Sequence, residues 1–473
     1  MDPSHDPSPL ARAATLLLLA TIFVILIGGV VSGVAISRNR SFQVDEVEHV
    51  HAAYNVADGR ALYRDFWEGH NPLLYVVLLP LVDVDDPVGT FRRSRLLVLV
   101  LLSATIGLTC WTANRLAGPS AAVVSGGLLL FATSFAERGI EVRPDNMVAL
   151  AIAGALAAQV SSLAESRRLS LQGLLLGLGF LATSKVIVAT AAFGTLWVVL
   201  AFRRRRLFLL VAPAATWLAP LALAAIVLAA LGLLDDWARW NLLPYFQNVA
   251  RRAGPNLAFP PSLLLTPEAL RNPFFVASSL SALLLVAVAS ARRNPAARDL
   301  WFPAGLSLAC LAFLRVNPYP FPYNLVTVLP TFAVLCGVFW GLVAVRLSRL
   351  APPALASAGV CALCLAFAAV PSAERRISKS VPGNGQQLAT LGAIQRVTGP
   401  TDRVFDLAGL YFRPDAYPVF TMTGVMLRRY ERGFFPAIIP ALEANEVTAF
   451  IDNYRLRALP DREKRFLAEH FVR

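Results

Sequence analysis

Charged residues are scarce in this chain, and lysine is almost missing. Only 15% of the 473 residues are Asp, Glu, Lys or Arg, and the lysines are Lys185, Lys379 and Lys464. Hydrophobic residues make up 56% of the chain, and the mean hydropathy is +0.58. A water-soluble protein of this length needs more polar surface, because much of its chain must face water. The composition therefore excludes a soluble protein and indicates a membrane protein.

Cysteine is also rare, and its positions argue against two kinds of site. The cysteines all fall within apolar segments, at Cys110, Cys310, Cys336, Cys361 and Cys364. The last two form a CxxC pair, but no histidine or acidic residue lies beside them. We interpret the cysteines as small core residues, and expect neither a disulfide framework nor a cysteine-based zinc site.

Long apolar runs dominate what is present. Many approach or exceed the roughly 18 residues that a helix needs to cross a bilayer. The first run is long for a signal peptide and lacks a clear cleavage site, so we expect an uncleaved helix there. The sequence predicts an all-α polytopic membrane protein with about eleven transmembrane helices, at 13–36, 96–114, 119–136, 146–164, 169–185, 186–202, 207–233, 273–291, 300–314, 324–345 and 354–370.

The remaining segments define the expected domains. Residues 1–12 should form a disordered cytoplasmic tail, and 13–370 a transmembrane catalytic domain. Within it, 37–95 form a large first exterior loop whose apolar run at 73–84 is too short to span, which predicts a juxtamembrane helix. Residues 371–473 change composition sharply, and mixed helix-like and strand-like patterns predict a small C-terminal α/β exterior domain.

Arginine sets the expected orientation. The net charge is +13, and arginines gather in short loops on one side of the predicted helices, at Arg115, Arg167, Arg168, 203–206, Arg292, Arg293, Arg298, Arg346 and Arg349. Positive residues mark cytoplasmic loops, so this side faces the cytoplasm and the charge reads as topology rather than nucleic-acid binding. We expect a multi-pass protein of the bacterial inner membrane, with the N-terminus cytoplasmic and the C-terminal domain outside.

An acidic cluster follows the first helix directly. It comprises Asp45, Glu46 and Glu48, with His49 and His51 close behind. On a helix, Asp45 and His49 share one face, at the membrane surface where a lipid-linked head group would lie. A carboxylate there could act as a general base on an acceptor hydroxyl. A solvated amphipathic surface helix is the plain alternative.

This cluster resembles the acidic motif of GT-C glycosyltransferases, which take sugars from polyprenyl-phosphate carriers. The segment 59–75 is also similar to theirs, although Asn71 replaces a proline, so that His70-Asn71-Pro72-Leu73 is a partial match. The resemblance implies a GT-C fold, with Asp45 as catalytic base and Glu46 as its helper. It implies a polyprenyl-phosphate-linked sugar donor and a glycan, lipid or protein acceptor outside the membrane. One displacement with a phosphate leaving group would invert configuration, without a second carboxylate nucleophile.

Several cations could hold the donor phosphate at the outer boundary. Guanidinium groups match phosphate with paired hydrogen bonds. Arg92 and Arg95 lie at the outer end of the second helix, where snorkelling to lipid head groups is the alternative. Arg143, in the tripeptide Arg143-Pro144-Asp145, and Lys185 match phosphate-side residues of the relatives. Helix capping would explain Asp145 by itself. A second Arg-Pro-Asp, at 413–415, shows how easily the tripeptide arises.

The expected substrate pocket adds His49, His70, Asp145 and Tyr323 to these residues. Tyr323 could instead belong to an aromatic belt at the membrane surface. Pocket-lining residues at 234–272 should decide the sugar. No cofactor is certain, and a divalent metal is left open, since Asp45, His49, His51 and His70 could supply ligands.

Two other functions compete with a transferase. A lipid-linked glycan transporter or flippase would place charges at the membrane midplane and often shows repeats, whereas here the charges gather at the outer boundary and no repeat is visible. An oligosaccharide ligase would share the transferase architecture.

Overall fold

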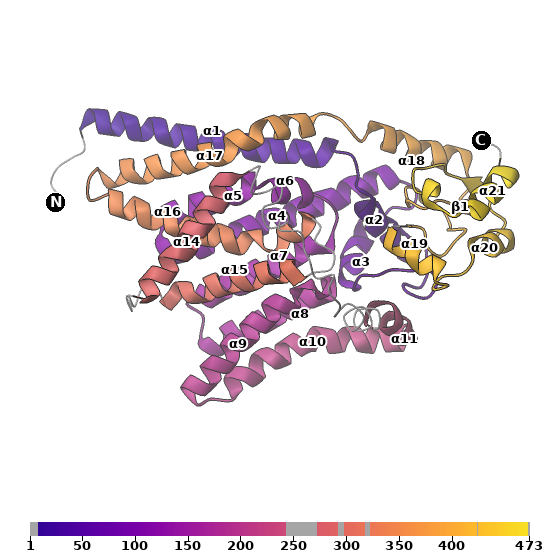
Figure 1. Cartoon of the computed structure of the whole chain (residues 1–473), viewed down its shortest axis with the longest axis horizontal. Helices are drawn as coiled ribbons and strands as arrows, with labels where there is room; N and C mark the ends of the chain where they lie inside the picture. Colours follow the sequence, from indigo (N-terminus) through magenta and orange to yellow (C-terminus); the bar gives the residue numbers. More distant parts are fainter. Residues whose placement is uncertain (1–7, 243–271, 292–297, 317–321, 423, 472–473) are drawn as a thin grey trace.

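The structure, a computed structural model, describes residues 8–242, 272–291, 298–316, 322–422 and 424–471. A long helical bundle carries a smaller group of helices and short strands at one end (Figure 1). The N-terminus lies at the opposite end of the bundle. Of the tail predicted to be disordered at 1–12, residues 1–7 fall outside the described residues, whereas residues 9–12 form the first turn of α1 (Pro9–Asn39). Most of the predicted sugar-pocket loop at 234–272 also falls outside the described residues.

Each predicted transmembrane segment corresponds to a separate helix of the bundle, although 119–136 continues past α5 into the short helix α6 (Thr133–Arg138) and 324–345 begins in η7 (Pro322–Thr327). These helices are α1 (Pro9–Asn39), α4 (Pro87–Ala117), α5 (Pro119–Phe131), α7 (Pro144–Val160), α8 (Glu165–Ala182), α9 (Ile187–Arg204), α10 (Phe208–Ala230), α14 (Pro273–Ala291), α15 (Arg298–Val316), α16 (Leu329–Leu347) and α17 (Pro353–Ser380). In the described part of the chain, seven helices are long and apolar enough to cross a membrane, while α5, α7 and the apolar part of α15 are shorter. The polytopic all-α architecture is confirmed, and the number of crossings stays a prediction.

Proline fixes where several of these helices begin. α4, α5, α7 and α17 all start with proline at the first helical position, where the missing N–H costs nothing. Asp86 caps α4 by accepting a hydrogen bond from the Gly89 N–H. α4 therefore begins nine residues before the predicted apolar segment, and α17 continues ten residues past its predicted end at 370.

Close helix packing depends on small residues. α10 lies along α8, where a side chain at Gly173 or Gly177 would clash with the backbone carbonyls of Pro213 and Trp217. α16 approaches α5 in the same way, because Gly337 lies against Ala121 and its neighbours. Such contacts between small residues are typical of membrane helix bundles, where they allow backbones to approach closely.

Short elements form the end of the bundle near the C-terminal part. They are α2 (Val44–Ala57), α3 (Leu73–Leu78), η1 (Leu79–Leu81), α6 (Thr133–Arg138), η2 (Ser184–Val186), α11 (Leu234–Trp237), η3 (Ala238–Leu242) and η7 (Pro322–Thr327). A capping box starts α2, in which Gln43 and Glu46 satisfy each other's backbone N–H groups. The apolar run expected to form a juxtamembrane helix becomes α3 and η1.

The C-terminal part is more helical than an α/β domain suggests. It contains α18 (Gly385–Val397), β1 (Val404–Phe405), α19 (Gly424–Glu431), α20 (Ile438–Ala444), β2 (Ala449–Phe450), η8 (Leu456–Ala458) and α21 (Asp461–His470). β1 and β2 form a short parallel pair, with Val404 opposite Ala449. A separate hydrophobic core around Phe405, Tyr417 and Ile438 holds these elements together, except for α18, whose Leu391 belongs to the core of the bundle.

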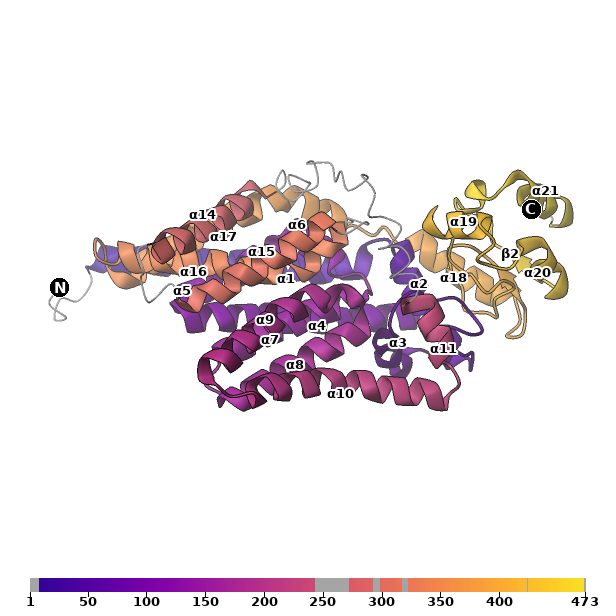
Figure 2. The same ribbon diagram turned by 60° about the horizontal axis from the view of Figure 1, so that its bottom comes forward.

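The two ends of the bundle differ in the charged residues that they carry. The turn between α9 and α10, which carries Arg203–Arg206, lies at the end with the N-terminus in both views (Figures 1 and 2). α2 and α3 lie at the other end, beside the C-terminal part (Figure 2). The arginine-rich turn and the acidic cluster of α2 are thus on opposite ends, as the sequence-based orientation requires.

Candidate active site

An ion pair between Asp45 and Arg143 joins two elements at the α2 end of the bundle. Asp45 lies in the first turn of α2, and Arg143 is the residue just before α7. The Asp45 Oδ2 and Arg143 Nη1 atoms are 2.7 Å apart. The Asp45 side chain is 35% exposed, whereas that of Arg143 is 6% exposed. A partly exposed carboxylate is therefore paired with a buried guanidinium.

Asp145, Lys185 and Tyr323 complete what we call the Arg143 cluster. Lys185 Nζ lies 2.6 Å from Asp145 Oδ1, and Asp145 Oδ2 lies 3.5 Å from Arg143 Nε. The Tyr323 ring lies over both cations, 3.5 Å from Arg143 Cζ and 4.6 Å from Lys185 Nζ. Aromatic faces attract cations. The structure thus brings together five of the predicted site residues from four separate elements of the chain.

The electrostatics of the cluster keep Asp45 ionised. Burial alone would raise the pKa of Asp45, but the charge of Arg143 and its hydrogen bond outweigh burial and hold that pKa below the usual range. Asp45 is therefore a carboxylate at neutral pH. It can accept a proton, and its strength as a base depends on Arg143.

Arg143 also belongs to a network of ion pairs that the sequence did not reveal. Glu141 Oε2 is 3.4 Å from Arg143 Nη1, and Glu141 Oε1 pairs with Arg40 at 3.0 Å and Arg138 at 2.8 Å. Arg375 of α17 pairs with Glu137. The segment before α7 is therefore fastened to α1 and α17. Only the charged pattern of 137–145 hinted at this network, since its partners are far apart in sequence.

Glu46 and Arg95 pair with each other, and this arrangement does not support their predicted roles. Arg95 Nε and Nη2 lie 2.7 and 2.8 Å from the two Glu46 carboxylate oxygens. Arg95 also donates to the Ser37 and Arg40 carbonyls, and it is only 3% exposed. Its donors serve to fasten α4 to the end of α1 and the start of α2. Arg92 is exposed on α4, and none of the contacts described for the Arg143 cluster involves it.

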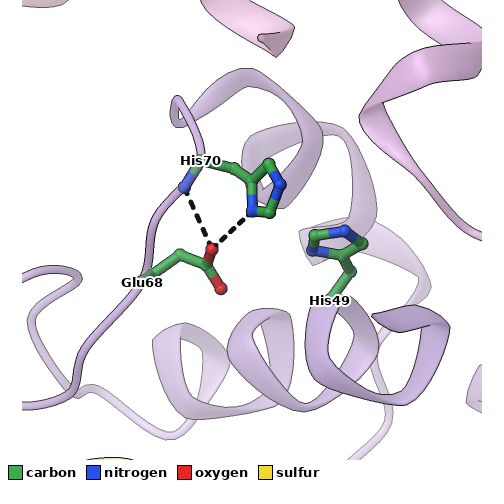
Figure 3. A group of neighbouring side chains, drawn as sticks. All are labelled: His49, Glu68 and His70. Atoms are coloured by element: carbon green, nitrogen blue, oxygen red, sulfur yellow. Dashed lines mark hydrogen bonds and ion pairs between the residues drawn. The ribbon is translucent and has the colours of Figure 1, made fainter. Parts of the chain in front are cut away.

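His49 and His70 lie together in a second cluster with Glu68 (Figure 3). Their rings meet edge to face at 4.6 Å, and His70 Nδ1 lies 2.8 Å from Glu68 Oε1. His49 and Glu68 are completely buried. Burial, together with the positive charges of His70, Arg143 and Lys185, holds the pKa of His49 well below its usual range. Glu68 had no role in the sequence-based prediction.

Asn71, the departure from the family motif, has a structural use of its own. Its side-chain amide donates to the Phe180 carbonyl of α8, and its oxygen accepts from Trp237 Nε1 of α11 at 3.2 Å. A proline could make neither contact. Asparagine in place of proline at this position therefore ties the segment before α3 to two neighbouring helices.

His51 does not join the metal-ligand candidates. Its ring nitrogens face the Tyr411 carbonyl at 2.7 Å and the Asp415 carboxylate at 2.9 Å, and the ring is fully buried. Asn55 and Arg60 also contact Asp415, at 2.8 and 2.9 Å. His51 therefore anchors α2 to the C-terminal part.

The C-terminal part also brings a cation toward Asp45. Arg455 is 9% exposed, and its buried Nη1 has no hydrogen-bond partner. Its charge acts to lower the pKa of Asp45 and of Glu48. For Glu48, burial and the Glu68 and Asp45 carboxylates prevail and raise the pKa well above its usual range. No sequence signal marked Arg455, because its position depends entirely on the fold.

Comparison with known proteins identifies the fold. No protein-family model and no curated protein sequence matches the chain. Among solved structures, it is similar to ArnT from Cupriavidus metallidurans bound to undecaprenyl phosphate, with a TM-score of 0.55 and 14% identity over 97% of this chain and 95% of ArnT. Apo ArnT gives a TM-score of 0.52 and 13% identity over 86% of both chains. An Archaeoglobus fulgidus oligosaccharyltransferase in complex with Zn and sulfate gives 0.50 and 11% over 82% of this chain and 62% of that one.

These likenesses define the fold class: the chain has the GT-C fold of membrane glycosyltransferases. Within that class, its alignment with ArnT, an aminoarabinose transferase, spans nearly the whole of both proteins. The fold implied by the motif resemblance is therefore confirmed. At these identities the likeness is one of architecture, so substrate and mechanism must be argued from the site.

Proposed function

We propose that this protein is an inverting glycosyltransferase that moves a sugar from a polyprenyl-phosphate donor to a glycan, lipid or protein acceptor. The observation that carries this proposal is the contact of Asp45, a half-exposed carboxylate, with Arg143, a buried guanidinium, at the membrane-surface end of the bundle. Lys185 stands beside them through Asp145. A general base and two phosphate-binding cations on one rim are what such a reaction requires.

Arg143 and Lys185 suit a lipid phosphate for two reasons. A guanidinium binds phosphate oxygens through paired, charge-assisted hydrogen bonds, and these strengthen where water is excluded. Both cations also lie at the ends of bundle helices, since Arg143 directly precedes α7 and Lys185 lies between α8 and α9. A carrier lipid lying along the bundle would present its phosphate at this level. The undecaprenyl phosphate bound to ArnT, a protein of the same fold, supports this class of donor.

The reaction would proceed in one displacement. The acceptor hydroxyl attacks the anomeric carbon while Asp45 takes its proton, and the bond from that carbon to the phosphate oxygen breaks. The leaving polyprenyl phosphate keeps the electron pair, and its negative charge is stabilised by Arg143 and Lys185. Asp45 then releases the proton to water. Attack from the side opposite the phosphate inverts the anomeric configuration.

The donor should separate Asp45 from Arg143. In a displacement of this kind the base and the leaving phosphate lie on opposite sides of the anomeric carbon, which is incompatible with a 2.7 Å contact between Asp45 and the phosphate-binding guanidinium. We therefore assign the ion pair to the donor-free enzyme, with the donor phosphate replacing Asp45 on Arg143. Because Arg143 lowers the pKa of Asp45, its transfer to the phosphate would make Asp45 a stronger base once the donor is bound.

The orientation and partners follow from the same site. The acidic cluster lies opposite the arginine-rich turn of 203–206, so the reaction would occur on the outer face of a bacterial inner membrane, with the N-terminus in the cytoplasm. Arg455 is placed to contact an anionic group of donor or acceptor. A divalent metal has one candidate position among the described residues, at His49, Glu68 and His70.

Purified protein in lipid nanodiscs, supplied with synthetic polyprenyl-phosphate hexoses and pentoses and with envelope glycolipids as acceptors, tests the proposal. We expect sugar transfer with release of polyprenyl phosphate, both reduced by about 10²–10⁴-fold in an Asp45→Asn variant. The same donors carrying a fluorescent label, in proteoliposomes, test the flippase alternative. Movement of the lipid across the bilayer without cleavage would overturn the proposal. Transfer only of preassembled oligosaccharides would instead indicate a ligase.

A further inference from the structure

We propose that His49, Glu68 and His70 bind a divalent transition-metal ion, with Zn²⁺ the best match for this donor set. His49 comes from α2, one helical turn after Asp45, whereas Glu68 and His70 come from the segment between α2 and α3 (Figure 3). The inference does not depend on the proposed reaction, because it concerns residues outside the Arg143 cluster.

The donor atoms of the three residues converge. One ligand atom from each lies within 4.8 Å of the others. In Figure 3 the two rings lie beside each other, and the Glu68 carboxylate is directed toward His70. An ion with bonds of about 2.0–2.2 Å to nitrogen and oxygen would draw them together by small side-chain movements.

Two of these side chains carry buried atoms without a partner. His49 Nε2 and Glu68 Oε2 make no hydrogen bond, although both residues are completely buried. A buried polar atom without a partner destabilises the folded protein, and more so when the atom is charged. Both atoms belong to the same cluster, so a single ligand that accepts electron pairs from nitrogen and oxygen would satisfy them together. A metal ion is such a ligand.

The neighbouring hydrogen bonds prepare the donors for metal binding. Glu68 Oε1 accepts from the Gly69 and His70 backbone N–H groups at 2.7 and 3.0 Å, which fixes the carboxylate and leaves Oε2 available. His70 Nδ1 lies 2.8 Å from Glu68 Oε1, so an ion that replaced the proton between them would be bound by both residues. His49 Nδ1 faces Tyr75 Oη at 3.3 Å, which leaves the lone pair of its Nε2 for the ion. Metal-binding histidines usually have such a partner for their second nitrogen.

Charge also favours a cation at this position. Glu68 is completely buried, and the ion pairs described for it reach only His70. A divalent ion held by the two imidazoles and this carboxylate would offset its buried negative charge. It would also fix the 58–72 segment against α2 beside Asp45. A fourth position would stay open to water or a substrate oxygen.

Cobalt titration tests this site directly. The full-length protein, purified in detergent with a tag that contains no histidine, is stripped with a chelator and titrated with Co²⁺. We expect one ion per chain with the visible absorption bands of tetrahedral Co²⁺, displaced by Zn²⁺. His49→Gln and His70→Gln should each weaken binding by more than the roughly 10–100-fold that loss of an outer partner costs. Tyr75→Phe should fall within that range.

Two controls keep the result interpretable. His470→Gln, at an exposed histidine of α21, should bind Co²⁺ like the natural sequence. Size-exclusion profiles and circular dichroism establish that each variant is folded. If the fully buried His49 proves essential for folding, the half-exposed His70 still supplies the test. No tetrahedral spectrum in the natural sequence, or unchanged binding in a folded His70→Gln variant, would overturn the proposal.

Discussion

The tripeptide Arg-Pro-Asp occurs twice, and both copies contact α2. The first does so through its arginine and the second through its aspartate. In the first copy, Arg143 faces α2 and pairs with Asp45. In the second, Asp415 faces α2 and pairs with His51 at 2.9 Å. Arg413 turns away and donates to the Gln395 and Thr398 carbonyls. α2 is thus held between two like tripeptides from parts of the chain that are about 270 residues apart.

Burial distinguishes the two contacts. The second is closed, because His51 and Asp415 are almost completely buried and Asn55, Arg60 and Tyr411 also hydrogen-bond to Asp415. The first is open, because the Asp45 side chain is 35% exposed. A buried and fully bonded network specifies structure, whereas an exposed carboxylate on a buried cation is free to exchange partners. Identical tripeptides therefore have different roles, which burial decides.

The largest expected effect is at the open contact. Asp45→Asn removes the base and should lower turnover by about 10²–10⁴-fold, the usual contribution of general-base catalysis. Donor affinity should be unchanged or higher, because Arg143 loses its competing carboxylate. Turnover and donor binding measured on one preparation check both statements. Asp85→Asn, at an exposed acid of the same loop, is the matched control and should keep full turnover.

At the closed contact, Asp415→Asn should affect stability. Loss of one partner from a buried ion pair costs about 3–5 kcal/mol, because it leaves the other charge uncompensated. We expect a lower unfolding midpoint and faster proteolysis of the C-terminal part, whereas Glu443→Gln, at an exposed residue of α20, should change neither. An unchanged midpoint for Asp415→Asn would show that this contact does not fasten α2.

Acid should weaken the closed contact in the natural sequence too. Burial would raise the pKa of Asp415, but His51 and Arg60 outweigh it, so its folded-state pKa lies below the ordinary value of about 3.9. Its contribution to stability is therefore present above that pH and is lost as the pH falls through the lower, folded-state value. The Asp415→Asn variant should lack this part of the acid sensitivity.

Arg143→Gln should weaken donor binding without preventing folding. Hydrogen bonds to charged groups contribute about 1.5–3 kcal/mol, which corresponds to a loss of affinity of about 10–100-fold. Arg413→Gln, the same change in the other tripeptide, should leave the donor affinity of the folded protein unchanged. Equal losses in both variants would contradict the distinction between open and closed contacts.

The pH dependence of kcat/KM offers a finer comparison, because this ratio reports groups in the free enzyme. Asp45 must be ionised to act as a base, and Arg143 holds its pKa below the usual range. The acid limb should therefore lie below the ordinary pKa of aspartate, about 3.9. Arg143→Gln removes the lowering charge and should move that limb to higher pH. A limb that stays in place would mean that Arg143 does not control Asp45.

The smallest effect is expected at Arg455. If its unpartnered Nη1 contacts an anionic group of the substrate, Arg455→Gln should raise KM about two- to tenfold, the contribution of one ordinary hydrogen bond, with kcat little changed. Arg457→Gln, two residues further on, is an exposed control. A lower kcat with unchanged KM would place Arg455 in the chemical step instead.

What the sequence could predict was local. Apolar length indicated the helices, and proline after Arg143 marked the start of α7. Glu46 was assigned a catalytic role from the family resemblance, and Arg95 a phosphate-binding role from its position at a helix end. The sequence could not show that the two side chains pair, because they lie 49 residues apart. Asp415 looked accidental because its partners lie about 360 residues away. Glu68 and Arg455 carried no local signal at all. Position relative to a helix end can be read from sequence, whereas the partners of buried charges depend on the tertiary fold.

A structure of the Asp45→Asn variant with a bound polyprenyl-phosphate sugar would show how the donor lies relative to Asp45 and Arg143, since this variant should bind the donor and consume it only slowly. We expect the phosphate within hydrogen-bonding distance, about 3 Å, of Arg143 and Lys185. We also expect the anomeric carbon between that phosphate and residue 45. A phosphate bound away from Arg143, or a sugar directed away from residue 45, would contradict it.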